Sequence, residues 1–442
     1  MMHRHLLGMF LILLAPLIGP AGSMAYADEP RASLHLGPML GAVGPDKAWI
    51  WIRASALATS QVIISENPEL QTGRTVAGPR LSAATDFAGV VSVVGLRPAT
   101  TYFYQVALDG VPVAEPPFSF TTAPPEGARG QLRFATTSCI GPPEMAERSW
   151  AALAPVPIAL LLQLGDNAYV DATDPARHRE EFYAQRAVPA YRAIAARTPT
   201  LAIWDDWDYA GNNSDGTEPG KARSLRTFKQ LWPNPSFGQA DDPGIYFKFS
   251  WGDVDFFMLD GRYHRSPNDL EDAGGKTMLG SAQFAWLKQG LVASRATFKF
   301  LVSGGQWESR GRSDSWASFM RERNELFQFI RDRRIGGVVL LSGDRHVSAA
   351  YQVQGRFIEI TSSPFAAENH EPPYNPAEMF MLHDEGHLFV VVDVNTATAE
   401  PSLTFEVHQV GAGIVRQQSF SWDEINGRVQ IPTCALLIDC RK

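Results

Sequence analysis

Short stretches of alternating apolar and polar residues, separated by turns, occupy residues 33 to about 122. They include 48–53, 61–65 and 90–94. In residues 100–106, a strand places Tyr102, Tyr104 and Val106 on one face, because successive side chains of a strand point to opposite sides. Many short strands with regular turns predict a β-sandwich of about 100 residues in this part of the chain.

The pattern changes after residues 124–130, a linker rich in Pro and Gly. The near-continuous apolar runs that predict buried strands are 158–164, 200–204, 256–259, 298–303 and 338–342. Helical periodicity lies between them, at 177–196, 222–232, 281–294 and 318–334. Alternation of buried strands with helices predicts a layered α/β domain, and strands return in residues 386–430.

One segment of the N-terminal part carries a recognisable pattern. Residues 96–106 read Leu-x-Pro-x-Thr-x-Tyr-x-Tyr-x-Val, and a Phe-Thr-Thr-Ala-Pro ending follows. This pattern resembles a fibronectin type III domain, an immunoglobulin-like sandwich. We therefore predict an N-terminal β-sandwich domain at 28–125, an α/β domain at 131–430 and a C-terminal tail at 431–442.

The first 27 residues have the layout of a secretory signal peptide. Arg4 precedes an apolar run at 6–18, and Ala25-Tyr26-Ala27 forms a small-residue cleavage pattern. The alternative, a membrane anchor, needs a run of roughly 20 apolar residues, which is longer than this one. We predict cleavage after Ala27, a secreted or periplasmic protein, and no membrane span in the mature chain.

Composition and charge narrow the class of protein. The chain has 442 residues, of which 45% are hydrophobic and 19% charged, so it is not a disordered chain. Its 39 Lys and Arg against 47 Asp and Glu give a net charge of −8. An acidic balance argues against nucleic acid as the main partner, because phosphate binding requires a basic face. A globular, enzymatic class is favoured.

The three cysteines divide into a pair and a single residue. Cys434 and Cys440 lie six residues apart near the C-terminus, and in an oxidising compartment they can close a small loop. Cys139 is left over. Its thiol is either buried and inert or occupied by a metal or a reaction.

Carboxylates and other ligand-type residues follow most of the apolar runs directly. They are Asp166 and Tyr169, Asp205 and Asp206, Asp260 and Arg262, and Asp344 and His346. Taken singly, each group has an ordinary interpretation as a turn, a helix cap or a core residue. Together they favour one crevice, because ligands of α/β folds collect at the carboxyl ends of strands. Crowded carboxylates need cations, and the mixture of oxygen donors with thiol, imidazole and phenol predicts at least two different metals.

These motifs resemble the alkaline phosphatase D family of the metallophosphoesterase (calcineurin-like) superfamily. The residues that carry the resemblance are Ser138-Cys139, Gly165-Asp166-x-x-Tyr169, Trp204-Asp205-Asp206, Leu259-Asp260-Gly261-Arg262-Tyr263 and Leu341-Ser342-Gly343-Asp344-Arg345-His346. The similarity extends over nearly the whole mature chain. It implies that residues 131–430 form a metallophosphoesterase catalytic domain.

The resemblance also implies a set of metal ligands. Ferric iron would be bound by Cys139, Asp166, Tyr169 and His346, because thiolate and phenolate are strong anionic donors. Asp166 would bridge to a divalent ion, calcium or another divalent metal, with further oxygens from Asp206, Asp344 and the amide of Asn213 or its neighbour Asn212. Asp344 and His346 are two residues apart at a strand end, so both can point the same way. The predicted catalytic residues are Asp166, Asp206, Arg262 and Asp344.

Two residues depart from the superfamily pattern. Trp207 occupies the place of a histidine that can protonate the leaving group, and an indole cannot transfer a proton at neutral pH. Another acid therefore serves, from His264, His370, His383 and His387, or the substrates have good leaving groups. Gln306 stands where many relatives place a metal-binding histidine, which favours an oxygen-rich, calcium-like second site. Arg262 and Arg345 are either phosphate clamps or structural partners of carboxylates such as Asp260.

The sequence thus predicts a secreted metal-dependent phosphoesterase in which a metal-bound hydroxide attacks phosphate monoesters or diesters. Its partner is a small-molecule or polymeric phosphate ester. The alternative is a non-catalytic secreted binding protein with a structural metal site. A zinc hydrolase is disfavoured, because only one of ten histidines lies in a ligand motif.

Overall fold

The computed structural model describes residues 31–308, 313–370, 375 and 377–434. The predicted signal peptide (1–27) and Cys440 lie outside these residues. Cys434 is disulfide-bonded, whereas Cys139 is a free, buried thiol. Among the helices that the structure describes, none has the length and apolar character needed to cross a bilayer.

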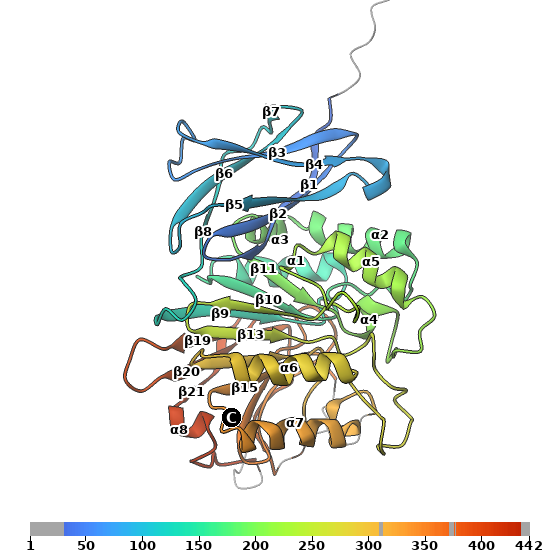
Figure 1. The fold of residues 1–442 in the computed structure, drawn as a ribbon, viewed down its shortest axis with the longest axis vertical. Helices are drawn as coiled ribbons and strands as arrows, with labels where there is room; N and C mark the ends of the chain where they lie inside the picture. Colours follow the sequence, from blue (N-terminus) through green and yellow to red (C-terminus); the bar gives the residue numbers. More distant parts are fainter. Residues whose placement is uncertain (1–30, 309–312, 371–374, 376, 435–442) are drawn as a thin grey trace, which may run out of the picture. The chain divides into compact units, whose positions relative to one another are not determined.

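Two antiparallel sheets form the N-terminal part (Figure 1). The first has the order β1-β2-β5, and the second β4-β3-β6-β7, with β8 also paired to β6. Their bounds are β1 Leu34–Val43, β2 Lys47–Ala54, β3 Ala58–Ser65, β4 Arg74–Leu81, β5 Ala88–Val94, β6 Thr101–Leu108, β7 Val111–Pro112 and β8 Phe118–Thr121. A short 3₁₀ turn, η1 (Ala83–Thr85), precedes β5. One hydrophobic core draws residues from both sheets.

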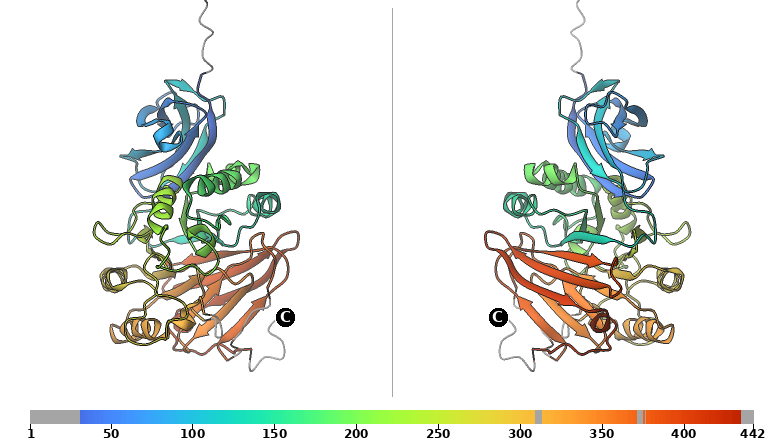
Figure 2. Two further views of the ribbon diagram at one scale, coloured as in Figure 1. Left: turned by 90° about the vertical axis from the view of Figure 1, so that its right-hand side faces the viewer. Right: turned by 90° about the vertical axis from the view of Figure 1, so that its left-hand side faces the viewer.

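The alternation predicted for 100–106 is confirmed in β6. Tyr102, Tyr104 and Val106 are buried in the shared core, whereas Phe103 and Gln105 are half-buried on the other face. The Tyr104 hydroxyl donates to the carbonyl of Ala196 at 2.7 Å, so this strand also contacts the rest of the chain. Figure 2 shows the blue N-terminal strands beside the green helices that follow them in sequence.

The remaining chain forms two larger mixed sheets. The six-stranded sheet has the order β11-β10-β9-β19-β20-β21, and the seven-stranded sheet β12-β13-β14-β15-β17-β16-β18. Their strands are β9 Gln131–Thr137, β10 Leu160–Leu164, β11 Thr200–Ile203, β12 Phe247–Trp251, β13 Val254–Met258, β14 Phe298–Val302, β15 Val338–Ser342, β16 Ser348–Val353, β17 Phe357–Thr361, β18 Met379–His383, β19 Leu388–Asn395, β20 Ser402–Gln409 and β21 Gly413–Phe420. The five apolar runs of the sequence are thereby confirmed as β10, β11, β13, β14 and β15.

Helices cover the outer faces of these sheets, so the layered α/β architecture is confirmed. Their bounds are α1 Pro143–Leu153, α2 Pro175–Ala187, α3 Pro189–Ala195, α4 Asp206–Tyr209, α5 Lys221–Leu231, α6 Ser281–Ala293, α7 Met320–Asp332 and α8 Trp422–Ile425, with a 3₁₀ turn, η2, at Trp316–Ser318. The helix predicted over 177–196 is two helices, α2 and α3. Pro189 separates them, because a proline disfavours helical backbone at the residue before it, here Val188 (φ −57°, ψ 117°).

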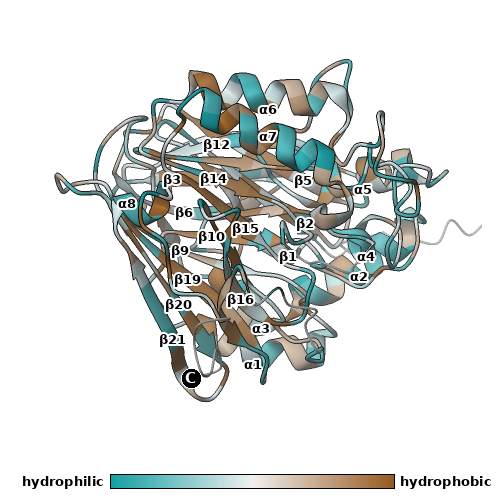
Figure 3. Ribbon diagram, turned by 90° about the horizontal axis from the view of Figure 1, so that it is seen from below, coloured by the Kyte–Doolittle hydropathy of each residue, from teal (hydrophilic) through white to brown (hydrophobic). Residues whose placement is uncertain are grey.

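The two larger sheets pack face to face through aromatic side chains. Phe134 of β9 contacts Phe256 of β13 and Phe300 of β14 edge-on, with ring centroids 5.3 and 5.2 Å apart. Phe257 and Leu301, one position further along, belong instead to the core beneath α6 and α7. This alternation explains why the central strands are apolar on both faces, as the brown strands of Figure 3 show.

Parallel pairing aligns the carboxyl ends of the central strands. β9, β10 and β11 are mutually parallel, and so are β13, β14, β15 and β17. The loops that leave β9, β10, β11, β14 and β15 therefore emerge at the same edges of the two sheets. This arrangement brings together the polar residues that follow the apolar runs.

Candidate metal centre

A cavity of about 730 Å³ opens among these strand-end loops. Five of the seven predicted metal ligands line it: Asp166, Tyr169, Asn213, Asp344 and His346. Trp207, Arg345, Met145 and His370 complete much of its wall. The other two predicted ligands, Cys139 and Asp206, are buried directly behind these residues.

Candidate ligand atoms form one continuous row. Three trios of side chains each hold donor atoms within 4.8 Å of one another: Cys139, Asp166 and His346; Asp166, Asp205 and Asp206; and Asp206, Asp314 and Asp344. The first and second trios share Asp166, and the second and third share Asp206. The thiol–imidazole end of the row is thus joined to an end made of carboxylates alone.

Shorter contacts define the thiol end of the row. The Sγ atom of Cys139 lies 3.5 Å from Oδ2 of Asp166, and the Tyr169 hydroxyl lies 3.3 Å from Nε2 of His346. Nδ1 of His346 contacts the carbonyl of Glu368 at 2.5 Å. This second contact fixes the ring orientation and leaves Nε2 toward Tyr169, which is how ligating histidines are usually held.

Backbone conformation at the site is unusual. Cys139, Asp166, Asn213, Asp344 and His346 all have φ between 52° and 67°, the left-handed region that side chains other than glycine rarely adopt. Such residues cost of order 1–3 kcal/mol each and cluster at functional sites, where the surrounding structure holds them in place. Five of the seven predicted ligands share this strain.

Two glycines let the loops converge on Asp205. A Cβ atom on Gly165 would lie 2.6 Å from the Cβ of Asp205, and one on Gly304 would lie 2.5 Å from its carboxyl carbon. Neither position has room for a side chain. The loops after β10 and β14 therefore approach the loop after β11 at backbone distance, which only glycine permits.

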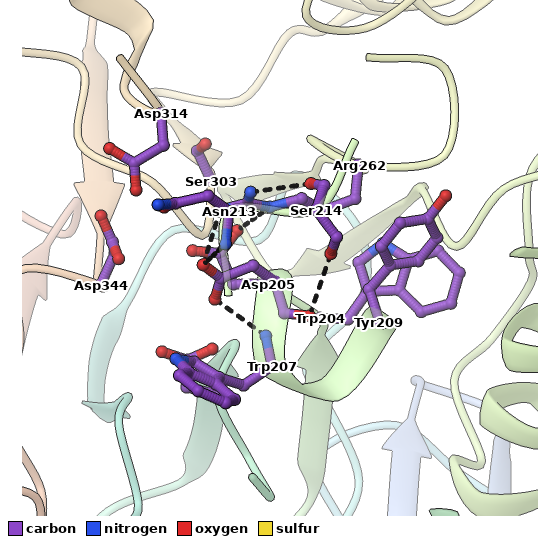
Figure 4. A network of polar contacts seen from close by, with 12 residues as sticks. Trp204, Asp205, Trp207, Tyr209, Asn213, Ser214, Arg262, Ser303, Asp314 and Asp344 are labelled. Carbon is purple, nitrogen blue, oxygen red and sulfur yellow. Dashed lines mark hydrogen bonds and ion pairs between the residues drawn. The ribbon is translucent and has the colours of Figure 1, made fainter. Parts of the chain in front are cut away.

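Asp205 organises the layer beneath the cavity (Figure 4). It precedes α4, and its backbone N–H donates to Oδ1 of Asp208 at 2.6 Å in a capping box. The Asp206 carboxylate that follows accepts the backbone N–H of Asn213 at 2.7 Å. This hydrogen bond holds Asn213 beside Asp206, as expected for two residues predicted to bind the same metal ion.

Arg262 does not line the cavity. It is fully buried, its Nε donates to Oδ1 of Asp205 at 2.6 Å, and its Nη2 lies 3.9 Å from Oδ2 of Asp206. Its predicted role as a phosphate clamp does not fit this position, because protein encloses the guanidinium. The alternative interpretation, a structural partner of a strand-end carboxylate, does fit, with Asp205 as the ion-pair partner in place of Asp260.

Asp344 and His346 lie near each other, but not for the reason that their spacing suggests. β15 ends at Ser342, so neither residue belongs to a strand, and both have left-handed backbone. They contribute to different trios of the row. Both side chains line the cavity, so they point the same way as predicted, but loop geometry and not strand alternation turns them there.

The sequence did not reveal Asp314, which completes the carboxylate end of the row. It is buried, and its Oδ1 lies 3.4 Å from Nη1 of Arg345. Gln306, whose place in the sequence favours an oxygen-rich second site, does not line the cavity itself, and its Nε2 donates to Thr361 at 2.8 Å. Asp314 sits within a long connection after β14 rather than directly after a strand, so no strand-end signal could have identified it.

Trp207 lies in the cavity wall rather than in the core. Its ring centroid is 5.3 Å from that of Tyr169. Of the four histidines proposed as alternative acids, His370 is the one that lines the described part of this cavity. It stacks on His346 with ring centroids 4.2 Å apart.

Burial and mutual repulsion disfavour negative charge at the row. Burial raises the pKa of the Cys139 thiol to about 12. It also raises the pKa of Asp166 well above the ordinary aspartate value, with a further contribution from the neighbouring Asp206 carboxylate. Oδ1 of Asp166 is buried and has no hydrogen-bond partner among the residues that the structure describes. A bound cation would satisfy that oxygen and reverse the charge balance, so the donor set fits a metal.

These shifts predict how the stability of metal-free protein depends on pH. Asp166 has a raised pKa in the folded state and an ordinary pKa near 3.9 in the unfolded state. Its contribution to folding stability is therefore complete below about pH 4, where the carboxyl is protonated in both states, and is lost as the pH rises and the carboxyl ionises. We expect the melting temperature of chelator-treated protein to fall more steeply above pH 4 than that of metal-loaded protein. Parallel melting curves with and without chelator across pH 4–9 measure this; identical slopes would contradict it.

Comparison with known proteins places this geometry in a family. The PhoD-like phosphatase family model matches residues 134–422, which include every residue of the row. The chain belongs to the PhoD-like phosphatase family. A separate domain family of unknown function (DUF7800) matches residues 31–125 of this PhoD-like chain.

Individual relatives agree with this membership. Alkaline phosphatase D of Bacillus subtilis (strain 168) is 24% identical over 352 residues, which is 68% of this PhoD-like chain and 59% of the relative's length. Among solved structures, one of PhoD covers 88% of this chain and 90% of its own, with a TM-score of 0.74 and 17% identity. A purple acid phosphatase from yellow lupin (Lupinus luteus) seeds covers 88% and 75%, with a TM-score of 0.65 and 12% identity. Both structures share the fold.

Proposed function

We propose that this chain is a metal-dependent phosphoric ester hydrolase that acts on phosphate monoesters, diesters or both. The observation that carries the proposal is the continuous row from Cys139 to Asp344 along the wall of an open cavity, in which Asp166 and Asp206 are each shared by two trios. Shared carboxylates are the usual bridges between neighbouring metal ions. Membership of the PhoD-like phosphatase family supports the same conclusion.

The two ends of the row suit different cations. Cys139, Asp166, Tyr169 and His346 offer thiolate, phenolate and imidazole donors, and we assign ferric iron to them. Asp206, Asp344 and Asp314 offer carboxylate oxygens, and Asn213 adds an amide oxygen. We assign calcium or another hard divalent ion to these oxygen donors. When bound, such metals would lower the pKa of a water ligand and stabilise developing charge on phosphoryl oxygens.

The residues of this chain would orient the ester between those cations. Arg345 lines the cavity, and its Nη1 donates to Oδ2 of Asp344 at 3.0 Å, so its guanidinium is fixed beside the carboxylate end of the row. A guanidinium at this position binds a phosphate oxygen by charge-assisted hydrogen bonds. Arg262 acts one layer below as a positioning residue, because it holds Asp205 and lies near Asp206.

The deciding experiment joins metal analysis with turnover. Purified protein would be assayed for bound metals and for hydrolysis of a chromogenic monoester and diester across pH, before and after chelation. We expect iron and a divalent metal, with activity that chelation removes and metal addition restores. Bound metal without turnover of either ester would instead support the alternative, a binding protein with a structural metal site.

We further propose the domain limits and location that the sequence indicates. The N-terminal β-sandwich, related to fibronectin type III or immunoglobulin-like domains, comprises 28–125; the catalytic domain comprises 131–430; and the tail comprises 431–442. The matched ranges 31–125 and 134–422 support the first two. Removal of residues 1–27 would release a secreted or periplasmic protein, which N-terminal sequencing of exported protein would test.

Tyr169 provides a spectroscopic test of the metal assignment. Phenolate bound to ferric iron absorbs visible light by charge transfer, so we expect a coloured protein that loses most of this band in Tyr169→Phe. Phe keeps the ring that packs beside Trp207, which makes loss of the hydroxyl the main change. A colourless and fully active wild-type protein without iron would refute the assignment.

Trp207 predicts a dependence on the leaving group. An indole cannot donate a proton to the departing oxygen at neutral pH, and general acids typically contribute 10²–10⁴-fold. We therefore expect aryl esters to be hydrolysed much faster than alkyl esters, with rates that rise steeply as the leaving-group pKa falls. Trp207→His is expected to narrow this gap. A rate independent of leaving-group pKa would point to another acid, for which His370 is the candidate in the cavity wall.

A further inference from the structure

A second, much smaller cavity lies among α1, α2, α3 and the end of α5. Its water-accessible volume is about 10 Å³, which is room for about one water molecule or one small ion. The side chains around it include Trp150, Gln185, Arg186 and Trp232, none of which is more than 7% exposed. Although it is small, its wall is rich in polar atoms.

Arg186 is the central feature of this wall. It is 3% exposed, and the described residues form no ion pair with it. Its Nη2 donates to the carbonyl of Leu231, and the Tyr191 hydroxyl also contacts the guanidinium. Within the described part of the chain, its Nε and Nη1 are buried without a hydrogen-bond partner. Its guanidinium lies over the indole rings of Trp51 and Trp232, 4.2 and 5.1 Å from their centroids.

No group in the described residues supplies the negative charge that a buried guanidinium requires. The titratable groups that act on Arg186 are the phenols of Tyr183 and Tyr191. Burial raises the pKa of both phenols to about 12, so both are neutral at physiological pH. Burial lowers the pKa of Arg186 only to about 10, which leaves it charged. An unpaired buried charge is costly, and proteins normally compensate it.

Other polar atoms of the same wall lack partners as well. The indole N–H groups of Trp150 and Trp232 are buried and make no hydrogen bond to the part of the chain that the structure describes, and neither do the amide oxygens of Asn167 and Gln185. Together with Nε and Nη1 of Arg186, N–H donors outnumber these acceptors. One water molecule could accept from two donors at most and would bring no charge.

We propose that this cavity is a buried binding site for a small monovalent anion, chloride or a related halide. Such an ion would neutralise Arg186 and accept hydrogen bonds from the surrounding guanidinium and indole N–H groups. The cavity is too small for phosphate or sulfate. An anion here would lie between α1, α2 and the residue that follows α5, close to the loop of Asn167. The backbone N–H of Asn167 donates to Asp208 beside the candidate metal centre.

The site can be tested on the full-length protein by two measurements. Crystals grown with bromide in place of chloride should show an anomalous scattering peak within this cavity. At constant ionic strength, the melting temperature should rise by at least about 2 °C as gluconate is replaced by chloride, because a ligand that binds only the folded state stabilises it. A water in the cavity, with no bromide peak, would overturn the proposal.

Two variants of α2 provide the matched comparison. Arg186→Gln removes the charge and should abolish the chloride dependence of the melting temperature. Arg177→Gln changes an exposed arginine of the same helix, which pairs with Glu180, and should retain it. If Arg186→Gln does not fold, the two measurements on the wild type decide. A bromide peak with equal melting temperatures in both salts would mean binding at crystal concentration only, which would also overturn the proposal.

Discussion

Asp166→Asn is expected to abolish metal-dependent activity while leaving the fold intact. Asp166 belongs to both the thiol trio and the trio of Asp205 and Asp206, so its loss removes a donor from two of the three trios. Loss of an outer partner of a metal ligand costs 10–100-fold in activity or metal affinity, and loss of a shared ligand should exceed about 100-fold. The assay is hydrolysis of the chromogenic esters, with metal content measured in parallel.

The same substitution should have the opposite effect on metal-free protein. Burial and the nearby Asp206 raise the pKa of Asp166, so a charged carboxylate there is unfavourable without a cation. Asparagine has nearly the same shape and no charge, so chelated Asp166→Asn should melt at the same or a higher temperature than chelated wild type above neutral pH. Asp174→Asn is the control, because Asp174 is an exposed helix cap and asparagine caps equally well. Full activity in Asp166→Asn would refute the proposed centre.

Asp314→Asn should weaken the carboxylate end of the row selectively. Asp314 shares a trio with Asp206 and Asp344 but with none of the thiol-end residues. We expect the affinity for the divalent metal to fall by at least about 10–100-fold, while iron content and the visible absorption band persist. Activity should return in part when the divalent metal is added in excess.

The control for this variant is Asp269→Asn, an exposed aspartate outside the cavity wall. It should leave metal affinity and turnover unchanged. If Asp314→Asn has wild-type divalent affinity, Asp314 serves only as the partner of Arg345, 3.4 Å away. Loss of iron together with the divalent metal would show that the two ends of the row do not bind independently.

Local patterns were sufficient to predict the elements of the fold. Apolar runs mark β10, β11, β13, β14 and β15, because a strand covered on both faces has no polar side. In β6, apolar and polar side chains alternate, because only one face of that strand is fully buried. The helix expected over 177–196 is the exception: its periodicity continues through Pro189, which divides it into α2 and α3.

The sequence by itself also determined which residues gather at the site. All seven predicted ligands, from Cys139 to His346, come together, because each comes after a strand of one of the two facing sheets, and parallel pairing aligns the carboxyl ends of those strands. Parallel neighbours run in the same direction, so their carboxyl ends lie at the same end of each sheet. The gathering of these side chains can therefore be predicted from the position of each residue relative to its own strand.

Tertiary structure decided what depends on distance between separate segments. Asp314 joins the row from the middle of a long loop, and Arg262 is enclosed beneath the cavity instead of lining it. Asp344 and His346 are aimed by left-handed backbone rather than by strand alternation. Burial, the partner of a charge and the direction of a loop side chain arise from contacts among residues far apart in sequence. Local periodicity carries no information about those contacts, so only the folded chain specifies them.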